Sequence, residues 1–237
     1  MGWLPDARYA AELEAEADRL AAAVTNRSPD ETVPSCPEWT VRDLITHVGT
    51  GHRLAAGIIE DRRTSMAEYR LVDAPADPHD WADWLAAGVR RLNAAVDDLG
   101  FGNRVWTWQP KYQTAGFWQR RMLHDLIVHR FDAEPDGDLA PDLAADGVAD
   151  FLDTMSYLAK VRGNDETLLF TATDTHDSWL VTLSPGSITW RDGGKAAKAI
   201  VVAPVTELLL ILNRRREPRA VHGDIALYQH WQNGTRF

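Results

Sequence analysis

The sequence predicts an α+β protein, in which a helical bundle is followed by a small unit that mixes strands and helices. Up to about residue 160, apolar residues recur with the spacing of amphipathic helices. After Gly163 the pattern changes to alternating, β-branched segments that are typical of strands. A chain of 237 residues can form one large domain or two small ones. We therefore expect two domains, residues 1–160 and residues 161–237.

The predicted bundle consists of successive helices with polar breaks between them. The first helix is expected near residues 7–24, and a polar loop interrupted by three prolines follows to Trp39. Thr40 and Asp43 resemble a capping box that opens a second helix near residues 41–61. Apolar periodicity predicts the remaining helices of this part near residues 79–98, 115–133 and 141–160.

The elements expected after the bundle are shorter. Strand-like segments cover residues 167–173 and 179–183, and a turn at Pro185 and Gly186 leads to a third that begins near Ile188. A further strand is predicted at residues 199–202. Two helices complete this part, one apolar at residues 206–212 and one terminal at residues 224–231.

Composition and charge exclude several classes of function. Lys and Arg number 25 against 35 Asp and Glu, which gives a net charge of −10 and makes binding to a phosphate backbone unexpected. The longest apolar runs fall far short of the roughly 20 residues that cross a bilayer. The N-terminal segment lacks the basic and apolar regions of a secretory signal. We therefore expect a cytoplasmic protein with neither nucleic-acid nor membrane partners.

Cys36 is the sole cysteine of the sequence. An internal disulfide and a zinc site built from several cysteines are therefore excluded. We interpret Cys36 as a structural residue of the Pro-flanked loop before the second helix, where Trp39 is expected to pack beside it.

The fourth predicted helix carries a candidate metal site. Asp125 and His129 are four residues apart and therefore project from the same helical face, whereas His124 points elsewhere. A carboxylate and an imidazole on one face can share a metal ion, or they can form an ordinary hydrogen-bonded pair. The second helix offers His47 or His52 as a third ligand, and the apolar stripe of that helix favours His52 as the inward-facing histidine.

Three sets of motifs carry a family resemblance. The first is the segment from Val33 to His47, VPSCPEWTVRDLITH, continued by His52 and Arg53; the second is MLHDLIVHRFDAE, from Met122 to Glu134. The third lies toward the C-terminus and comprises Thr173 to Thr175 with Trp179, the apolar segment from Ala203 to Leu210, Arg214 to Arg216, and Gly223 with Asp224. In their order and spacing, these motifs resemble the mycothiol-dependent maleylpyruvate isomerase family over nearly the whole chain.

The resemblance implies an N-terminal DinB-like four-helix bundle that holds one divalent metal, followed by a small sterol-carrier-like α/β domain. The family's metal ligands are a His on the second helix and a Glu-x-x-x-His pair on the fourth, which correspond to His47, Asp125 and His129. The matching Asp-Leu-x-x-His context favours His47 over His52. This chain departs from the family in having Asp in place of Glu. Zinc is the expected metal, and iron or another divalent ion also suits two histidines and a carboxylate.

The resemblance further implies a chemistry. A divalent ion with an open coordination position lowers the pKa of a bound thiol, and the thiol expected here is mycothiol. The thiolate would attack an electrophilic, unsaturated small-molecule substrate, either isomerising its double bond or remaining attached as in an S-transferase. Arg215 matches a family arginine that is suited to bind a substrate carboxylate in bidentate fashion.

A second class of function remains compatible with the sequence. A non-catalytic small-molecule binding protein on the same fold would also explain the ten tryptophans and the Asp at a position where the family has Glu. The sequence alone leaves the oligomeric state open.

Overall fold

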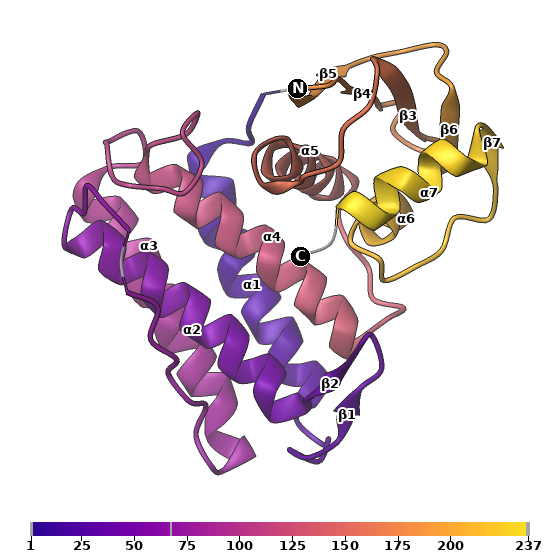
Figure 1. Cartoon of the computed structure of the whole chain (residues 1–237). Helices are drawn as coiled ribbons and strands as arrows, with labels where there is room; N and C mark the ends of the chain where they lie inside the picture. The colour runs from indigo at the N-terminus through magenta and orange to yellow at the C-terminus, as the bar shows by residue number, and fades with distance from the viewer. Residues whose placement is uncertain (1, 67, 236–237) are drawn as a thin grey trace. The chain divides into compact units, whose positions relative to one another are not determined.

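The computed structural model describes residues 2–66 and 68–235, which form two compact units. One unit comprises residues 4–137, and the other comprises the chain from Asp138 onward together with the N-terminal residues up to Trp3. The described residues contain helices and a mixed sheet, so the prediction of an α+β protein is confirmed (Figure 1).

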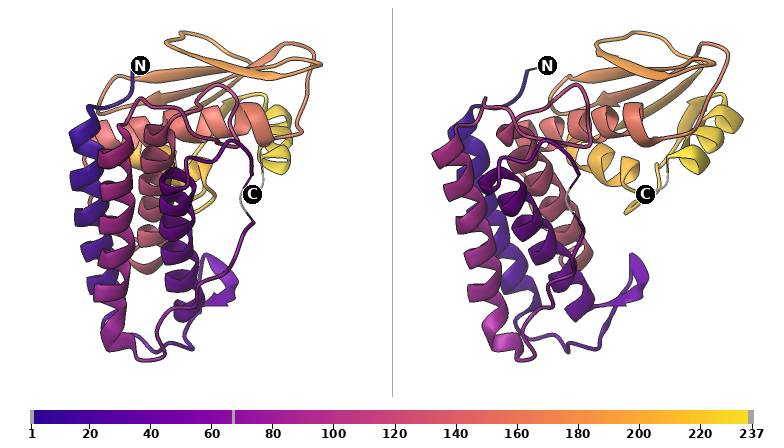
Figure 2. Two further views of the ribbon diagram at one scale, coloured as in Figure 1. Left: turned by 90° about the vertical axis from the view of Figure 1, so that its left-hand side faces the viewer. Right: turned by 60° about the vertical axis from the view of Figure 1, so that its left-hand side comes forward.

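The first unit is a bundle of four helices that lie side by side (Figures 1 and 2). In this bundle α2 packs against α3 and α4, and α1 packs against α3 and α4. The helices are α1 (Asp6–Val24), α2 (Val41–Glu60), α3 (Trp81–Leu99), which follows a short 3-10 turn at Pro78–Asp80, and α4 (Ala115–Ala133). The core between them consists of buried aliphatic side chains, among them Leu13, Leu20, Leu44, Ile45, Leu85, Leu92, Leu126 and Ile127. The four helices therefore occur where periodicity predicted them.

The start of α2 is fixed by local hydrogen bonds. The backbone N–H of Asp43 donates to the Thr40 hydroxyl at 3.2 Å, and the backbone N–H of Thr40 donates to the Asp43 carboxylate at 2.9 Å. These two bonds form the predicted capping box, and they satisfy N–H groups that the first turn of a helix leaves without partners. The orientation of the residues that follow, including His47, is set from this point.

The loop predicted before α2 contains a two-stranded hairpin, which is a correction to the sequence analysis. Strand β1 (Thr32–Val33) pairs with β2 (Cys36–Thr40) in antiparallel fashion, with Thr32 opposite Thr40 and Val33 opposite Cys36. Prolines usually indicate a break in a sheet, but a two-stranded ribbon has only edge strands, where Pro37 needs no partner for an N–H. Val33 is completely buried, and both strands of the hairpin contact α2, so the hairpin packs against the bundle.

The second unit is a five-stranded mixed sheet with helices. The strand order is β5-β4-β3-β6-β7, in which β3 and β6 are parallel and the other neighbours are antiparallel. The strands are β3 (Glu166–Ala172), β4 (Ser178–Leu183), β5 (Ile188–Asp192), β6 (Ala199–Ala203) and β7 (Val221–Gly223). The helices are α5 (Pro141–Leu158), α6 (Val205–Leu212) and α7 (Ile225–Gly234). Buried Phe170, Trp179 and Trp231 occupy its core.

Helix α5 belongs to the second unit by its contacts. It packs against α6 and β5, and the indole N–H of Trp190 donates to the Asp153 carboxylate at 3.2 Å. The two compact units therefore divide after Gly137. The sequence places its boundary between residues 160 and 161, because composition changes where strands replace helices rather than where packing changes. The two domains predicted from the sequence, a helical bundle over residues 1–160 and a small α/β domain over residues 161–237, stay a prediction.

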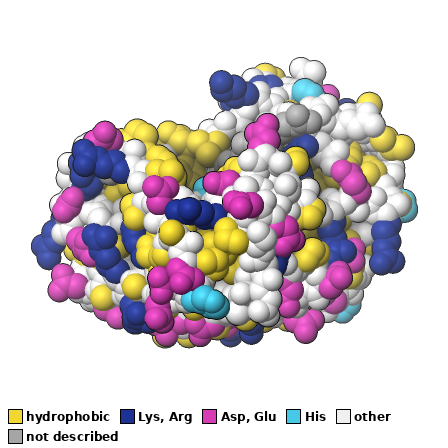
Figure 3. All heavy atoms as spheres, turned by 90° about the horizontal axis from the view of Figure 1, so that it is seen from below, with side chains coloured by type: hydrophobic (Ala, Val, Ile, Leu, Met, Phe, Trp, Pro, Cys, Tyr) yellow, Lys and Arg dark blue, Asp and Glu magenta, His cyan; other side chains and the backbone are white. Residues whose placement is uncertain are grey.

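The surface mixes charge types. On the face shown in Figure 3, acidic side chains lie among basic and apolar ones. Among the helices of the described residues, none combines the length and the apolarity that crossing a membrane requires.

Candidate metal centre

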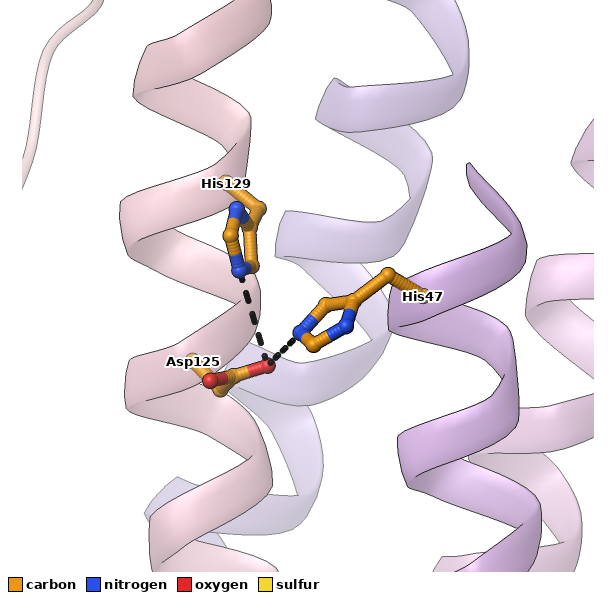
Figure 4. A group of neighbouring side chains, drawn as sticks. All are labelled: His47, Asp125 and His129. Atoms are coloured by element: carbon orange, nitrogen blue, oxygen red, sulfur yellow. Dashed lines mark ion pairs between the residues drawn. The ribbon is translucent and has the colours of Figure 1, made fainter. Parts of the chain in front are cut away.

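Three side chains from two helices of the bundle converge on one point (Figure 4). His47 projects from α2, and Asp125 and His129 project from consecutive turns of α4. Each residue offers one ligand atom, and these three atoms all lie within 4.8 Å of one another. The structure thus brings together the residues that the family resemblance selected from the sequence.

The distances within the group suit a shared cation. Nε2 of His47 lies 3.5 Å from Oδ2 of Asp125, and Nε2 of His129 lies 3.9 Å from the same oxygen. Ligands at 2.0–2.1 Å from a tetrahedral ion are separated from one another by about 3.3 Å. The observed separations are about 0.2 and 0.6 Å longer than that value, and the contact between His47 and Asp125 is at the long limit of a hydrogen bond. Because α2 packs directly against α4, the Asp125 carboxylate lies near the histidines of both helices.

The three side chains differ in exposure. The side chains of His47 and Asp125 are 38% and 29% exposed, whereas that of His129 is 9% exposed. A buried imidazole and two partly accessible side chains make a site at the margin of the bundle. The group is therefore accessible to a small molecule without opening the core.

Asp125 is held in its ionised form. Burial opposes ionisation, but the hydrogen bond from His47 and the charges of His129, His47 and Arg121 outweigh burial and keep the pKa of Asp125 well below its ordinary value. Nη2 of Arg121 lies 3.6 Å from the other carboxylate oxygen. The carboxylate is therefore available as an anionic ligand throughout the neutral pH range.

Asp132 is a functional candidate that the sequence analysis did not single out. Its fully buried carboxylate lies 2.8 Å from Nδ1 of His129, on the side of the ring opposite to Nε2. The spacing of three residues after His129 is a signal for this contact, because residues at i and i+3 are neighbours on a helix.

The comparisons with known proteins agree with this geometry. A family model described as "Mycothiol maleylpyruvate isomerase N-terminal domain" matches residues 10–134. The chain belongs to this family. The matched segment includes all three converging residues and lies within the first compact unit. No curated protein matches the sequence in the corresponding comparison.

Two solved structures of the maleylpyruvate isomerase family share the fold of this chain. The crystal structure of the mycothiol-dependent maleylpyruvate isomerase has a TM-score of 0.63 and 13% identity, covering 94% of this chain and 95% of that one. A histidine-to-alanine mutant of the same enzyme has a TM-score of 0.64 and 12% identity over the same shares. The similarity extends over both compact units, so the sheet and the bundle occur together in the family fold.

The structure places the two candidate histidines of α2 differently, with His47 beside Asp125 and His129 and His52 in the core. Helical periodicity indicated His52 as inward-facing, and His52 is indeed 1% exposed. Burial lowers the pKa of His52 to about 4, so its neutral form is favoured. His52 is not a member of the converging group, and neither is the buried His124. The inward face of α2 thus forms the core, while the candidate site lies at its margin.

The hairpin contributes an aromatic wall. The Trp39 ring lies 4.8 Å from the ring of His47 and 5.5 Å from that of His129, measured between centroids. Sγ of Cys36 lies 3.8 Å from Oδ2 of Asp132 rather than within the converging group. Both residues were expected to pack the loop before α2. In the structure Trp39 instead contacts the two candidate ligands.

Arg215 lies in the second unit, directly after α6. Its Nη1 donates to the carbonyl oxygen of Asn213 at 2.8 Å, and the side chain is half-buried. The preceding Arg214 has a positive φ of 63°, so the chain turns sharply at the end of the helix. The role of Arg215 in binding a substrate carboxylate stays a prediction.

Proposed function

We propose that this protein is a metal-dependent enzyme that uses mycothiol as a nucleophile against an electrophilic, unsaturated small molecule. The single observation that carries the proposal is the convergence of His47, Asp125 and His129 within the segment matched by the family model. The matched family and the two solved isomerases are named for mycothiol, and mycothiol is therefore the thiol that we propose.

The donor set fits a divalent ion. Two imidazole nitrogens and one carboxylate oxygen are ligands of zinc sites that keep an open position, and zinc is the metal we propose first. Ferrous iron accepts the same donors. When bound here, the ion would lower the pKa of a thiol in the open position, so that the thiolate forms at neutral pH.

The residues of the chain have separate tasks in this proposal. Asp125 provides the negative charge, since its pKa is held low. His129 provides a rigid nitrogen from a buried position, and His47 provides the second nitrogen from the exposed side. Trp39 covers the two imidazoles and excludes water from that side. The accessible parts of His47 and Asp125 mark the direction from which the thiol enters.

The reaction would begin when the thiolate sulfur bonds to one carbon of a conjugated double bond, whose electron pair moves to the adjoining carbonyl. The former double bond can then rotate. Return of the electron pair expels the sulfur and yields the isomer. If a proton instead adds to the carbon, the product keeps the thiol, as in an S-transferase. We propose that the Arg215 guanidinium binds a carboxylate of the substrate.

Turnover with and without mycothiol tests the proposal. Zinc-loaded protein is incubated with a panel of unsaturated dicarboxylates and other electrophiles, and products are separated by chromatography. We expect conversion that requires both mycothiol and zinc, that is lost in His129→Ala, and that is kept in His79→Ala, which changes an exposed histidine outside the converging group. The proposal fails if tryptophan fluorescence reports mycothiol binding that survives a chelator while no substrate turns over. That result favours a non-catalytic binding protein.

A further inference from the structure

Asp132 connects α4 to the hairpin. It lies in the last turn of α4, and its side chain is fully buried. One carboxylate oxygen, Oδ2, lies 2.8 Å from Nδ1 of His129, and the other accepts a hydrogen bond from the Ser35 hydroxyl at 2.5 Å. The Cys36 thiol lies 3.8 Å from Oδ2. A buried carboxylate requires such partners, because an unpaired charge in the interior is costly.

The contact with Nδ1 determines where the lone pair of the His129 ring lies. A neutral imidazole has one N–H and one nitrogen with a free lone pair. Both oxygens of Asp132 act as acceptors, Oδ1 from the Ser35 hydroxyl and Oδ2 from the Cys36 thiol, and an acceptor oxygen repels a lone pair. The geometry therefore favours the hydrogen on Nδ1 of His129. The lone pair is therefore on Nε2, the nitrogen that faces Asp125. Only this tautomer can bind a metal ion at the converging point.

The second oxygen of Asp132 has a separate effect. Ser35 precedes β2, which carries Trp39, and the Trp39 ring covers both His47 and His129. The two-stranded hairpin is short and has edge strands only. Isolated hairpins of this kind are marginally stable. The bond from Ser35 to Asp132 therefore helps to hold the aromatic wall beside the two imidazoles.

We propose that Asp132 is a positioning residue that fixes His129 as an Nε2 ligand and anchors the hairpin that places Trp39 over the site. This inference deepens the proposed function and rests on its metal site. Asp132 is not itself a ligand, since its carboxylate lies on the far side of the imidazole. Carboxylates that orient a ligating histidine in this way typically contribute 10–100-fold to metal affinity.

The tautomer can be measured in the metal-free protein. Protein labelled with ¹⁵N-histidine is studied by long-range ¹H–¹⁵N NMR at mildly alkaline pH, where imidazoles are neutral, and His129→Gln assigns the signals. We expect the Nδ1–H form of His129 in the wild type, loss of its dominance in Asp132→Ala, and retention in Ser35→Ala. An Nε2–H form in the wild type would overturn the inference.

Zinc affinity, measured by competition with a chromogenic chelator, gives the second readout. Asp132→Ala should bind zinc about 10–100-fold more weakly than the wild type. Asp132→Asn, which keeps an acceptor oxygen without the charge, should recover part of the loss. Ser35→Ala should bind zinc nearly as the wild type does, but acrylamide should quench its tryptophan fluorescence more strongly, because Trp39 becomes more accessible. Unchanged affinity in Asp132→Ala contradicts the inference.

The outcomes separate this inference from the proposed function. If the wild type binds no divalent metal, the proposed function fails, whereas the tautomer of His129 still tests the role of Asp132. If the wild type binds zinc and Asp132→Ala binds it equally well, only the inference about Asp132 fails. Should Asp132→Ala not fold, as judged by circular dichroism, the wild-type tautomer and the affinity of Asp132→Asn decide.

Discussion

The imidazole rings of His47 and His129 lie edge to face, with centroids 4.7 Å apart and planes at 73°. One ring comes from α2 and the other from α4, and the Asp125 carboxylate lies within ion-pair distance of both. The packing of α2 against α4 therefore brings two imidazole donors and one carboxylate donor together.

Substitution of Asp125 tests the contribution of its charge. Asp125→Asn keeps the size of the side chain and removes the anionic ligand. Loss of a residue that only hydrogen-bonds a metal ligand typically lowers affinity 10–100-fold, and we expect zinc affinity to fall by more than that in Asp125→Asn. Asp125→Glu restores the usual family residue and should bind zinc within about tenfold of the wild type, since the carboxylate donor is kept. Competition titrations with a chelator measure both. Wild-type affinity in Asp125→Asn would show that Asp125 is not a ligand.

Protonation of His52 should make stability depend on pH. Burial lowers the pKa of His52 to about 4 in the folded protein, against an ordinary value of 6.5, while Asp125 opposes this shift and Arg53 and His47 add to it. The unfolded state therefore binds the proton more readily than the folded state does. The contribution of neutral, buried His52 to the free energy of unfolding is complete above pH 6.5 and is lost as the pH falls toward 4. At that pH the free energy of unfolding should be lower by about 3 kcal/mol.

Urea unfolding at neutral and acidic pH measures this effect. The Nδ1 atom of His52 is buried and makes no hydrogen bond, so His52→Leu removes the titrating group without leaving a new polar partner unpaired. We expect the free energy of unfolding of the variant to depend less steeply on pH than that of the wild type. Identical slopes would mean that His52 has the same pKa in the folded and unfolded states, which would contradict the expected shift.

The ion pair between Arg130 and Glu16 should stabilise the bundle. Nε of Arg130 lies 2.5 Å from the Glu16 carboxylate, and both side chains are almost completely buried between α4 and α1. Glu16 also pairs with Arg19, whose side chain is 50% exposed, so removal of Arg130 leaves the buried carboxylate with this surface partner. Breaking a buried ion pair typically costs about 3–5 kcal/mol. Because Arg19 stays with Glu16, Arg130→Ala should lower the free energy of unfolding by about the lower end of that range.

A surface pair provides the control for Arg130. Nε of Arg8 lies 2.8 Å from Glu12, but the Arg8 side chain is 36% exposed, so Arg8→Ala should cost less than about 1 kcal/mol. Thermal and urea unfolding of the two variants give the comparison. Equal effects would argue against a special contribution of the buried pair.

Much of the fold could be predicted from sequence because its elements are strongly periodic. The fourth helix, expected at residues 115–133, is α4 with the same bounds, and the capping box at Thr40 and Asp43 is present. The hairpin and β7 were missed for physical reasons. Pro34 and Pro37 indicate a loop rather than strands, so the sequence does not predict β1 and β2. Strand β7 has three residues, which is too short to show alternation.

The site could be predicted only in part. Spacing placed Asp125 and His129 on one face, but periodicity alone pointed to His52 as their partner on α2. A hydrophobic stripe identifies the residues that enter the core, and His52 does so. Ligands at the margin of a bundle lie beside that stripe, where no periodic signal marks them. His47 is therefore indicated by the family motif, and the contacts of Asp132 and Trp39 with the site are visible only in the folded chain.

Cobalt substitution tests the central claim most directly. Co²⁺ replaces zinc in sites of this type and reports its ligands through visible absorption, and a thiolate bound to it adds a charge-transfer band in the near ultraviolet. We expect one Co²⁺ per chain and the appearance of that band when mycothiol is added, with both signals lost in His129→Ala and kept in His79→Ala. Failure of the wild type to bind Co²⁺ stoichiometrically, or a spectrum that mycothiol leaves unchanged, would contradict the account.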